Sequence, residues 1–268
     1  MDRLINGLPW LGYWEKDKQE AIFFKRSLNN EKILDILKQC KTRGVNGIWS
    51  IYSQEHKEIF DFAKREKIKM YFIVPNTSHY IRSLNQIGMV RTGIKKIMES
   101  NVFYLAKTGL RQIKNLPQIL NKDFSKALNL LTDLDIMSIK KYNPEAIFLD
   151  ATITDLAVAN NNQGLLNSWI LHVKKTHKLN VGLYTKNFKH LLKLPGLETD
   201  LIATPLYLNK SVSYNNCSKI INTNPFANNT LAPELAKVNK NKFLGCVFSI
   251  NSQKDIDTYL NSNISNLF

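Results

Sequence analysis

Cysteine, glycine and proline are all scarce in this 268-residue chain, which has 3, 11 and 8 of them. Their scarcity excludes a small disulfide-stapled scaffold and a collagen-like repeat. The cysteines, Cys40, Cys217 and Cys246, are far apart and form no CxxC pair. An odd number of scattered cysteines suits a reducing compartment, so we expect a cytoplasmic protein.

Long hydrophobic runs and cofactor motifs are also lacking. No apolar stretch approaches the roughly 18 residues of a membrane-spanning helix, and the N-terminal residues contain no apolar core of a secretory signal. The chain has no GxGxxG turn, no Walker motif, no GxSxG elbow, and no HxH or HxxE spacing. We therefore expect no membrane partner, no cofactor and no metal site.

The charge is strongly one-sided, because 37 lysines and arginines against 22 acidic residues give a formal net charge of +15. The basic residues are scattered in pairs such as Lys95-Lys96, Lys140-Lys141 and Lys174-Lys175 rather than gathered in one arginine-rich stripe. Scattered lysines usually form solvated helix faces. We interpret the charge as surface charge, with a polyanion site for nucleic acid as the alternative.

Hydrophobic residues make up 44% of the chain and aromatic residues 10%, which is enough for a sizeable core. Short apolar runs alternate with segments of helical periodicity; the first helix is expected at 30–43, with Asn30 as its N-cap and Gly44 as its stop. The expected strands lie within 4–14, 45–52, 68–75, 101–106, 146–150, 181–185, 201–205 and 243–250, and further helices at 54–67, 81–100, 124–141, 164–175 and 252–260.

About eight strands that alternate with helices predict a (β/α)8 barrel of the TIM type, α/β in class, formed by residues 1–268 as a single domain. The strands are nearly continuous apolar runs, as expected when both faces of a parallel sheet are covered. The alternative is an open doubly wound parallel sheet, which usually carries a glycine-rich phosphate turn. The Asn-rich stretch 209–230 is expected to be a long irregular loop.

The barrel prediction directs attention to the C-terminal ends of the strands, where the active sites of such barrels lie. Asp150 ends the run 146–150, so its carboxylate is expected at the rim, where burial would raise its pKa toward a value useful for acid–base catalysis. The alternative is a structural carboxylate that caps the following helix through Thr152 or Thr154.

Lys186 directly follows the expected strand at 181–185. Its position resembles that of the Schiff-base lysine of class I aldolases, in this one residue and without a surrounding family motif. A lysine at this place is also suited to binding a phosphate or carboxylate, and the third interpretation is a solvated surface lysine. On a barrel, Asp150 and Lys186 would follow neighbouring strands.

Other polar and aromatic residues would complete the site. Glu15 is expected to pair with Asp150 as a second carboxylate, as glycoside hydrolysis requires, unless it belongs only to a charged surface run. His79 is the histidine expected at the mouth, as a general acid or base, whereas His172 and His177 are expected to be surface or packing residues. The expected substrate-binding residues are Trp14, Tyr52, Asn76, Tyr80, Tyr184, Asn187 and Tyr207.

Three functions follow from these features. The leading one is an enzyme, a glycosidase-like hydrolase or a Schiff-base lyase, acting on a small sugar-like or phosphorylated molecule. The second is a non-catalytic barrel that binds a ligand or a protein. The third is a basic protein associated with nucleic acid. Because one fold hosts many functions, the fold alone does not choose among them.

Overall fold

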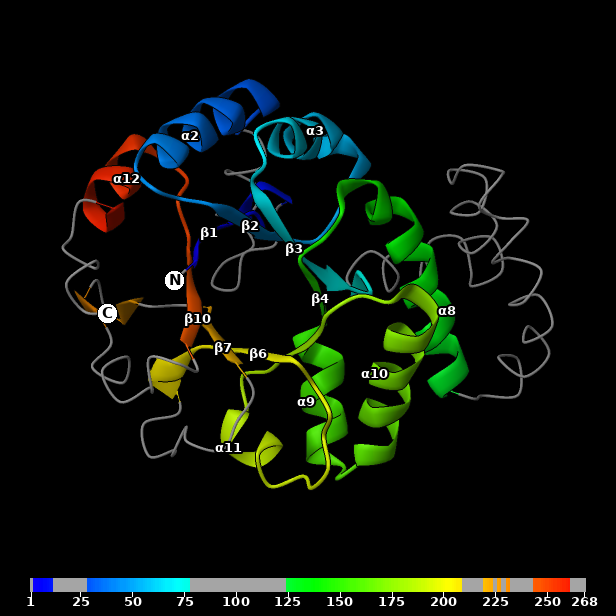
Figure 1. The fold of residues 1–268 in the computed structure, drawn as a ribbon. Coiled ribbons are helices and arrows are strands. Elements are labelled where there is room, and N and C mark those ends of the chain that lie inside the picture. Colours follow the sequence, from blue (N-terminus) through cyan, green and yellow to red (C-terminus); the bar gives the residue numbers. More distant parts are fainter. Residues whose placement is uncertain are drawn as a thin grey trace.

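The computed structural model describes residues 2–11, 28–77, 124–208, 219–223, 226–227, 230–231 and 243–260. Eight parallel strands close into a barrel, and helices surround it (Figure 1). The (β/α)8 prediction is confirmed, and the open sheet is wrong. Around the barrel the strands follow the order β1 (Asp2–Asn6), β10 (Phe243–Phe248), β7 (Lys219–Asn222), β6 (Leu201–Thr204), β5 (Val181–Tyr184), β4 (Ala146–Leu149), β3 (Lys69–Val74) and β2 (Gly47–Ser50).

The described helices follow β1, β2, β3, β4, β5 and β10 in the sequence. They are α2 (Asn30–Thr42), α3 (Lys57–Arg65), α8 (Phe124–Ile139), α9 (Ala151–Ala159), α10 (Gln163–His177), α11 (Phe188–Leu191) and α12 (Gln253–Leu260). Single 3-10 turns lie at Pro9–Leu11, Gln54–His56, Lys140–Tyr142 and Leu206–Leu208, and β8 (Phe226–Ala227) pairs with β9 (Thr230–Leu231) in a separate antiparallel sheet.

The start of α2 differs by one residue from the prediction. The N-cap is Asn29, whose side chain accepts a hydrogen bond from the Lys32 amide at 3.0 Å, and Asn30 is the first helical residue. Two adjacent asparagines offer the same capping oxygen, so sequence does not distinguish them. The helix stops at Gly44 as expected, because its φ of 86° is a conformation that glycine tolerates.

The identity of one barrel strand also differs from the prediction. β3 pairs directly with β4, Tyr71 opposite Ala146, so no strand lies between them in the sheet. The segments 81–100 and 101–106, expected to form a helix and a strand, lie outside the described residues. The remaining strand is β7, within the stretch 209–230 that was predicted to be a loop. The loop prediction is wrong at 219–222. Only two isoleucines indicate a strand there, and β7 pairs with β6 on one side and with β10 on the other.

Alternate strand residues form two cores, one inside the barrel and one between the barrel and the helices. Ile48, Phe72, Ile147, Leu183 and Ile202, which were predicted to share one parallel sheet, belong to the outer core. The inner core includes Trp49. The centroid of its ring lies 4.5 Å from that of the Phe148 ring and 5.6 Å from that of the Tyr184 ring. Side chains therefore fill the barrel, and the ends of its strands are the places where polar groups gather.

Candidate functional site

The C-terminal rim of the barrel is described in part. Residues 12–27, 78–123 and 209–218 follow β1, β3 and β6 in the sequence and lie outside the described residues. Four predicted site residues fall there, namely Glu15, His79, Trp14 and Tyr80, and only the backbone of Tyr207 is described. The site is therefore built from the ends of the remaining strands.

Asp150 follows β4 and is the N-cap of α9. One carboxylate oxygen, Oδ1, accepts a hydrogen bond from the Thr152 amide at 2.8 Å, which is the structural role that the sequence set against catalysis. The Asp150 amide donates to the Val74 carbonyl at 3.0 Å and so extends the pairing of β4 with β3. Because Phe148 belongs to the inner core and Leu149 to the outer, the strand alternation directs Asp150 toward the mouth.

The electrostatics of Asp150 are unusual for a helix cap. Burial raises the pKa of its carboxyl above the ordinary value, although hydrogen bonds from Thr152 and Thr77 and the positive charge of Lys186 act to lower it. A capping carboxylate normally gains from its backbone donors and the helix dipole, and its pKa falls. Here burial outweighs them, so Asp150 holds a proton more readily than an ordinary aspartate does.

Lys186 follows β5, which pairs with β4, so the expectation that it follows a strand next to Asp150 is confirmed. Its backbone is held by Asp155 of α9, which accepts hydrogen bonds from the Lys186 amide at 3.2 Å and from the Thr185 hydroxyl. In the structure α9 positions both candidate groups, one through its cap and one through Asp155.

The other described candidates have varied surroundings. Tyr184 is half-buried at the end of β5, with its ring against Trp49. The Asn76 amide donates to Asp135 of α8 at 2.7 Å, and the Asn187 side chain accepts from His190 Nδ1 at 2.6 Å. The Tyr52 ring packs near Phe60 and Tyr142 beside the outer core, and its hydroxyl donates a hydrogen bond to Gln54 at 2.7 Å.

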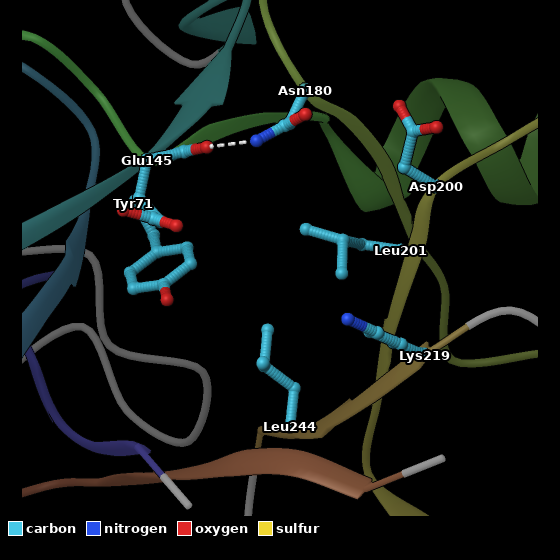
Figure 2. Close-up of a pocket in the computed structure, with 7 residues that line it drawn as sticks. All are labelled: Tyr71, Glu145, Asn180, Asp200, Leu201, Lys219 and Leu244. Atoms are coloured by element: carbon cyan, nitrogen blue, oxygen red, sulfur yellow. Dashed lines mark hydrogen bonds between the residues drawn. The ribbon is translucent and has the colours of Figure 1, made fainter. Parts of the chain in front are cut away.

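A pocket of about 340 Å³ opens at the opposite, N-terminal end of the strands (Figure 2). It is lined by Tyr71, Glu145, Asn180, Asp200, Leu201, Lys219 and Leu244, and the Lys219 amine and the Tyr71 ring point into it. Beside it Asp2 is buried and accepts hydrogen bonds from Tyr71 at 2.6 Å, Lys69 at 2.9 Å and Asn46 at 2.8 Å. In barrels of this type the N-terminal ends of the strands usually contribute to stability, and the active site lies at the C-terminal ends. The pocket is therefore not the first candidate for an active site.

The sequence did not predict a buried group in the helical layer. Asp133 of α8 is hydrogen-bonded to both His172 and His177 of α10. Each Nε2 atom lies 2.7 Å from the same carboxylate oxygen, Oδ1. The interpretation of both histidines as surface or packing residues therefore misses their common partner. Histidines five positions apart near a helix end are the only signal in the sequence, because the carboxylate lies on another helix.

Comparison with protein-family models, with curated proteins and with solved structures finds no match. Within the part of the chain that the structure describes, no helix is both long and apolar enough to cross a bilayer. Cys40 and Cys246 are free buried thiols, and burial raises the pKa of Cys40 to about 12.

Proposed function

We propose that this protein is a barrel enzyme that acts on a small sugar-like or phosphorylated substrate at the C-terminal ends of its strands, in the cytoplasm. The observation that carries the proposal is the environment of Asp150. Its carboxyl has a raised pKa and is directed toward the mouth of the barrel. The positive charge of Lys186, which follows the neighbouring strand, acts on it. A carboxyl that holds its proton more readily and a nearby cation are the pair that acid–base catalysis on an anionic or carbonyl substrate uses.

Two reaction types fit this pair. In hydrolysis, protonated Asp150 donates its proton to the departing oxygen. Water attacks the atom that this oxygen leaves and gives up a proton to Glu15, the predicted second carboxylate. In carbon–carbon lysis, the neutral Lys186 amine attacks a carbonyl, and protonated Asp150 supplies the proton with which the carbonyl oxygen leaves as water. The resulting iminium takes up the electron pair of the broken bond, and ionised Asp150 accepts the proton of the substrate hydroxyl.

A non-catalytic ligand- or protein-binding barrel is the second candidate, and the capping bond from Thr152 favours it. If Asp150 serves only as a cap, its contribution is confined to the stability of α9. A nucleic-acid-associated protein remains the alternative reading of the +15 charge. The first two candidates differ in what an isosteric replacement of Asp150 does.

Asp150→Asn is expected to abolish activity, at least about 100-fold in kcat/KM, while the melting temperature barely changes. Asparagine caps helices about as well as aspartate, so α9 keeps its cap, whereas loss of an acid–base group lowers the rate by roughly 100- to 10,000-fold. Activity is assayed on aryl glycosides, aryl phosphates and hydroxy-carbonyl compounds, with borohydride trapping for the last class. Lys186→Ala is expected to weaken substrate binding or to eliminate trapping.

A matched control separates catalysis from capping. Asn162 caps α10 through the Leu165 amide at 3.0 Å and is not one of the predicted site residues. Asn162→Ala and Asp150→Ala should each lose about 1 kcal/mol of unfolding free energy, but only Asp150→Ala should lose activity. Full activity in Asp150→Asn would rule out the catalytic assignment and leave the binding barrel.

A further inference from the structure

The group formed by Asp133, His172 and His177 has the composition of a transition-metal site. Its three ligand atoms, one carboxylate oxygen and two imidazole nitrogens, all lie within 4.8 Å of one another. Asp133 comes from α8 and both histidines come from α10, two helices that pack side by side in the outer layer (Figure 1). We propose that this group binds a zinc ion, or a related first-row divalent ion, that joins α8 to α10.

The ligand chemistry selects the class of ion. Two imidazoles and one carboxylate suit zinc and its first-row neighbours, whereas magnesium and calcium prefer sites made of oxygen ligands alone. Each histidine presents Nε2 to the group, so a shift of the imidazole proton to Nδ1 frees both lone pairs for a metal. Both Nε2 atoms already lie beside the same carboxylate oxygen, Asp133 Oδ1.

The spacing of the ligand atoms is close to what a zinc ion requires. Zinc bonds to nitrogen and oxygen are about 2.0–2.2 Å long, which puts tetrahedral ligand atoms roughly 3.3–3.5 Å apart. Each Nε2 now lies 2.7 Å from Asp133 Oδ1. Entry of the ion would therefore widen these two contacts by about 0.7 Å, a change within the reach of small side-chain torsions.

The surroundings hold the ligands in place and leave one side open. Asp133 is 1% exposed, and the adjacent Thr132 accepts a hydrogen bond from the Trp169 indole at 2.9 Å, one turn before His172 on α10. The side chain of His172 is 19% exposed and that of His177 only 6%. An ion would enter past His172, and water on that side would supply the fourth ligand.

The position of the group in the fold determines what a bound ion would do. Asp133 lies on α8, and His172 and His177 lie on α10. Since the ligands belong to the outer helices and not to the strand ends, the ion would stabilise the packing of α8 on α10.

The test is metal binding by the full-length, tag-free protein after chelator treatment. We expect one equivalent of zinc per chain in competition with a chromophoric chelator, a higher melting temperature with zinc, and no response to magnesium. Cobalt should give the visible absorption of a four-coordinate nitrogen and oxygen site, without a thiolate charge-transfer band. His172→Gln and His177→Gln should each weaken zinc binding at least about 100-fold.

His190→Gln is the matched control, because His190 of α11 contacts Asn187 and not Asp133. It should bind zinc as the wild type does. His172→Gln is the decisive variant. The His172 side chain is more exposed than that of His177, so its replacement should disturb the fold less. Absence of stoichiometric zinc binding in the wild type, a thiolate band with cobalt, or unchanged affinity in both glutamine variants would each overturn the proposal.

Discussion

Gly182→Ala is expected to destabilise the barrel by at least about 3 kcal/mol or to prevent its folding, the larger end of what overpacking does. A Cβ atom at Gly182 would lie 2.1 Å from the Phe148 ring, far inside van der Waals contact. The Phe148 ring has little room to move, because the centroid of the Trp49 ring lies 4.5 Å from its own centroid within the inner core. Urea unfolding of the purified variant measures the loss.

A rescue and a control accompany this substitution. Phe148→Leu in the same chain removes the obstructing ring, so the double variant should be more stable than Gly182→Ala alone, a negative coupling that defines a direct contact. Gly164→Ala, in the first turn of α10, meets nothing closer than 3.8 Å. It should be neutral or stabilising by up to about 1 kcal/mol. Stability of Gly182→Ala within about 0.5 kcal/mol of wild type would contradict the packing described for the inner core.

Asp2→Ala is expected to lower the unfolding free energy by about 2–3 kcal/mol at neutral pH, because it leaves the buried Tyr71 hydroxyl without its acceptor and removes the partner of Lys69. The contribution of Lys69 to this figure is small, since its side chain is 42% exposed. Asp35→Ala is the control: Asp35 pairs with Lys38 at 3.4 Å on the exposed face of α2, and its loss should change stability by less than about 0.5 kcal/mol.

The effect of Asp2 should depend on pH in a defined direction. Burial alone would raise the pKa of Asp2, but hydrogen bonds from Tyr71, Lys69 and Asn46 outweigh it and hold the pKa below its ordinary value. A carboxyl with a lowered folded-state pKa stabilises the fold above the unfolded pKa, about 3.9, and loses that contribution as the pH falls through the folded value. The difference between wild type and Asp2→Ala should therefore be full at pH 6 and shrink below about pH 4. A difference that grows in acid would show that Asp2 is not the ionised partner of Tyr71.

Much of the fold was predictable because its information is local. Runs such as 70–74 and 146–149 are apolar at every position, since both faces of each strand are buried, and helical spacing separates them. The strand at 219–222 escaped prediction for the converse reason. Only Ile220 and Ile221 are apolar there, and the strand exists because β6 and β10 provide hydrogen-bond partners on both sides.

The candidate site was predictable in position but not in detail. The sequence placed Asp150 and Lys186 at the ends of neighbouring strands, because strand order in such a barrel follows chain order. The sequence left open whether Asp150 caps a helix. The structure shows that the Asp150 carboxylate accepts a capping hydrogen bond from the Thr152 amide, and that burial raises its pKa. Nothing in the sequence indicated that Asp155 would hold the backbone after β5.

The alternation of apolar strands and amphipathic helices therefore determined the barrel from the sequence alone, since each residue's preference for one face is set by its own side chain and near neighbours. Tertiary structure alone decided which polar groups meet. Asp133 lies 39 residues before His172 in the chain, yet their atoms approach to 2.7 Å because α8 packs on α10. The residue pattern within one helix does not indicate which side chain of another helix it will contact. Only the folded chain therefore shows that Asp133, His172 and His177 meet.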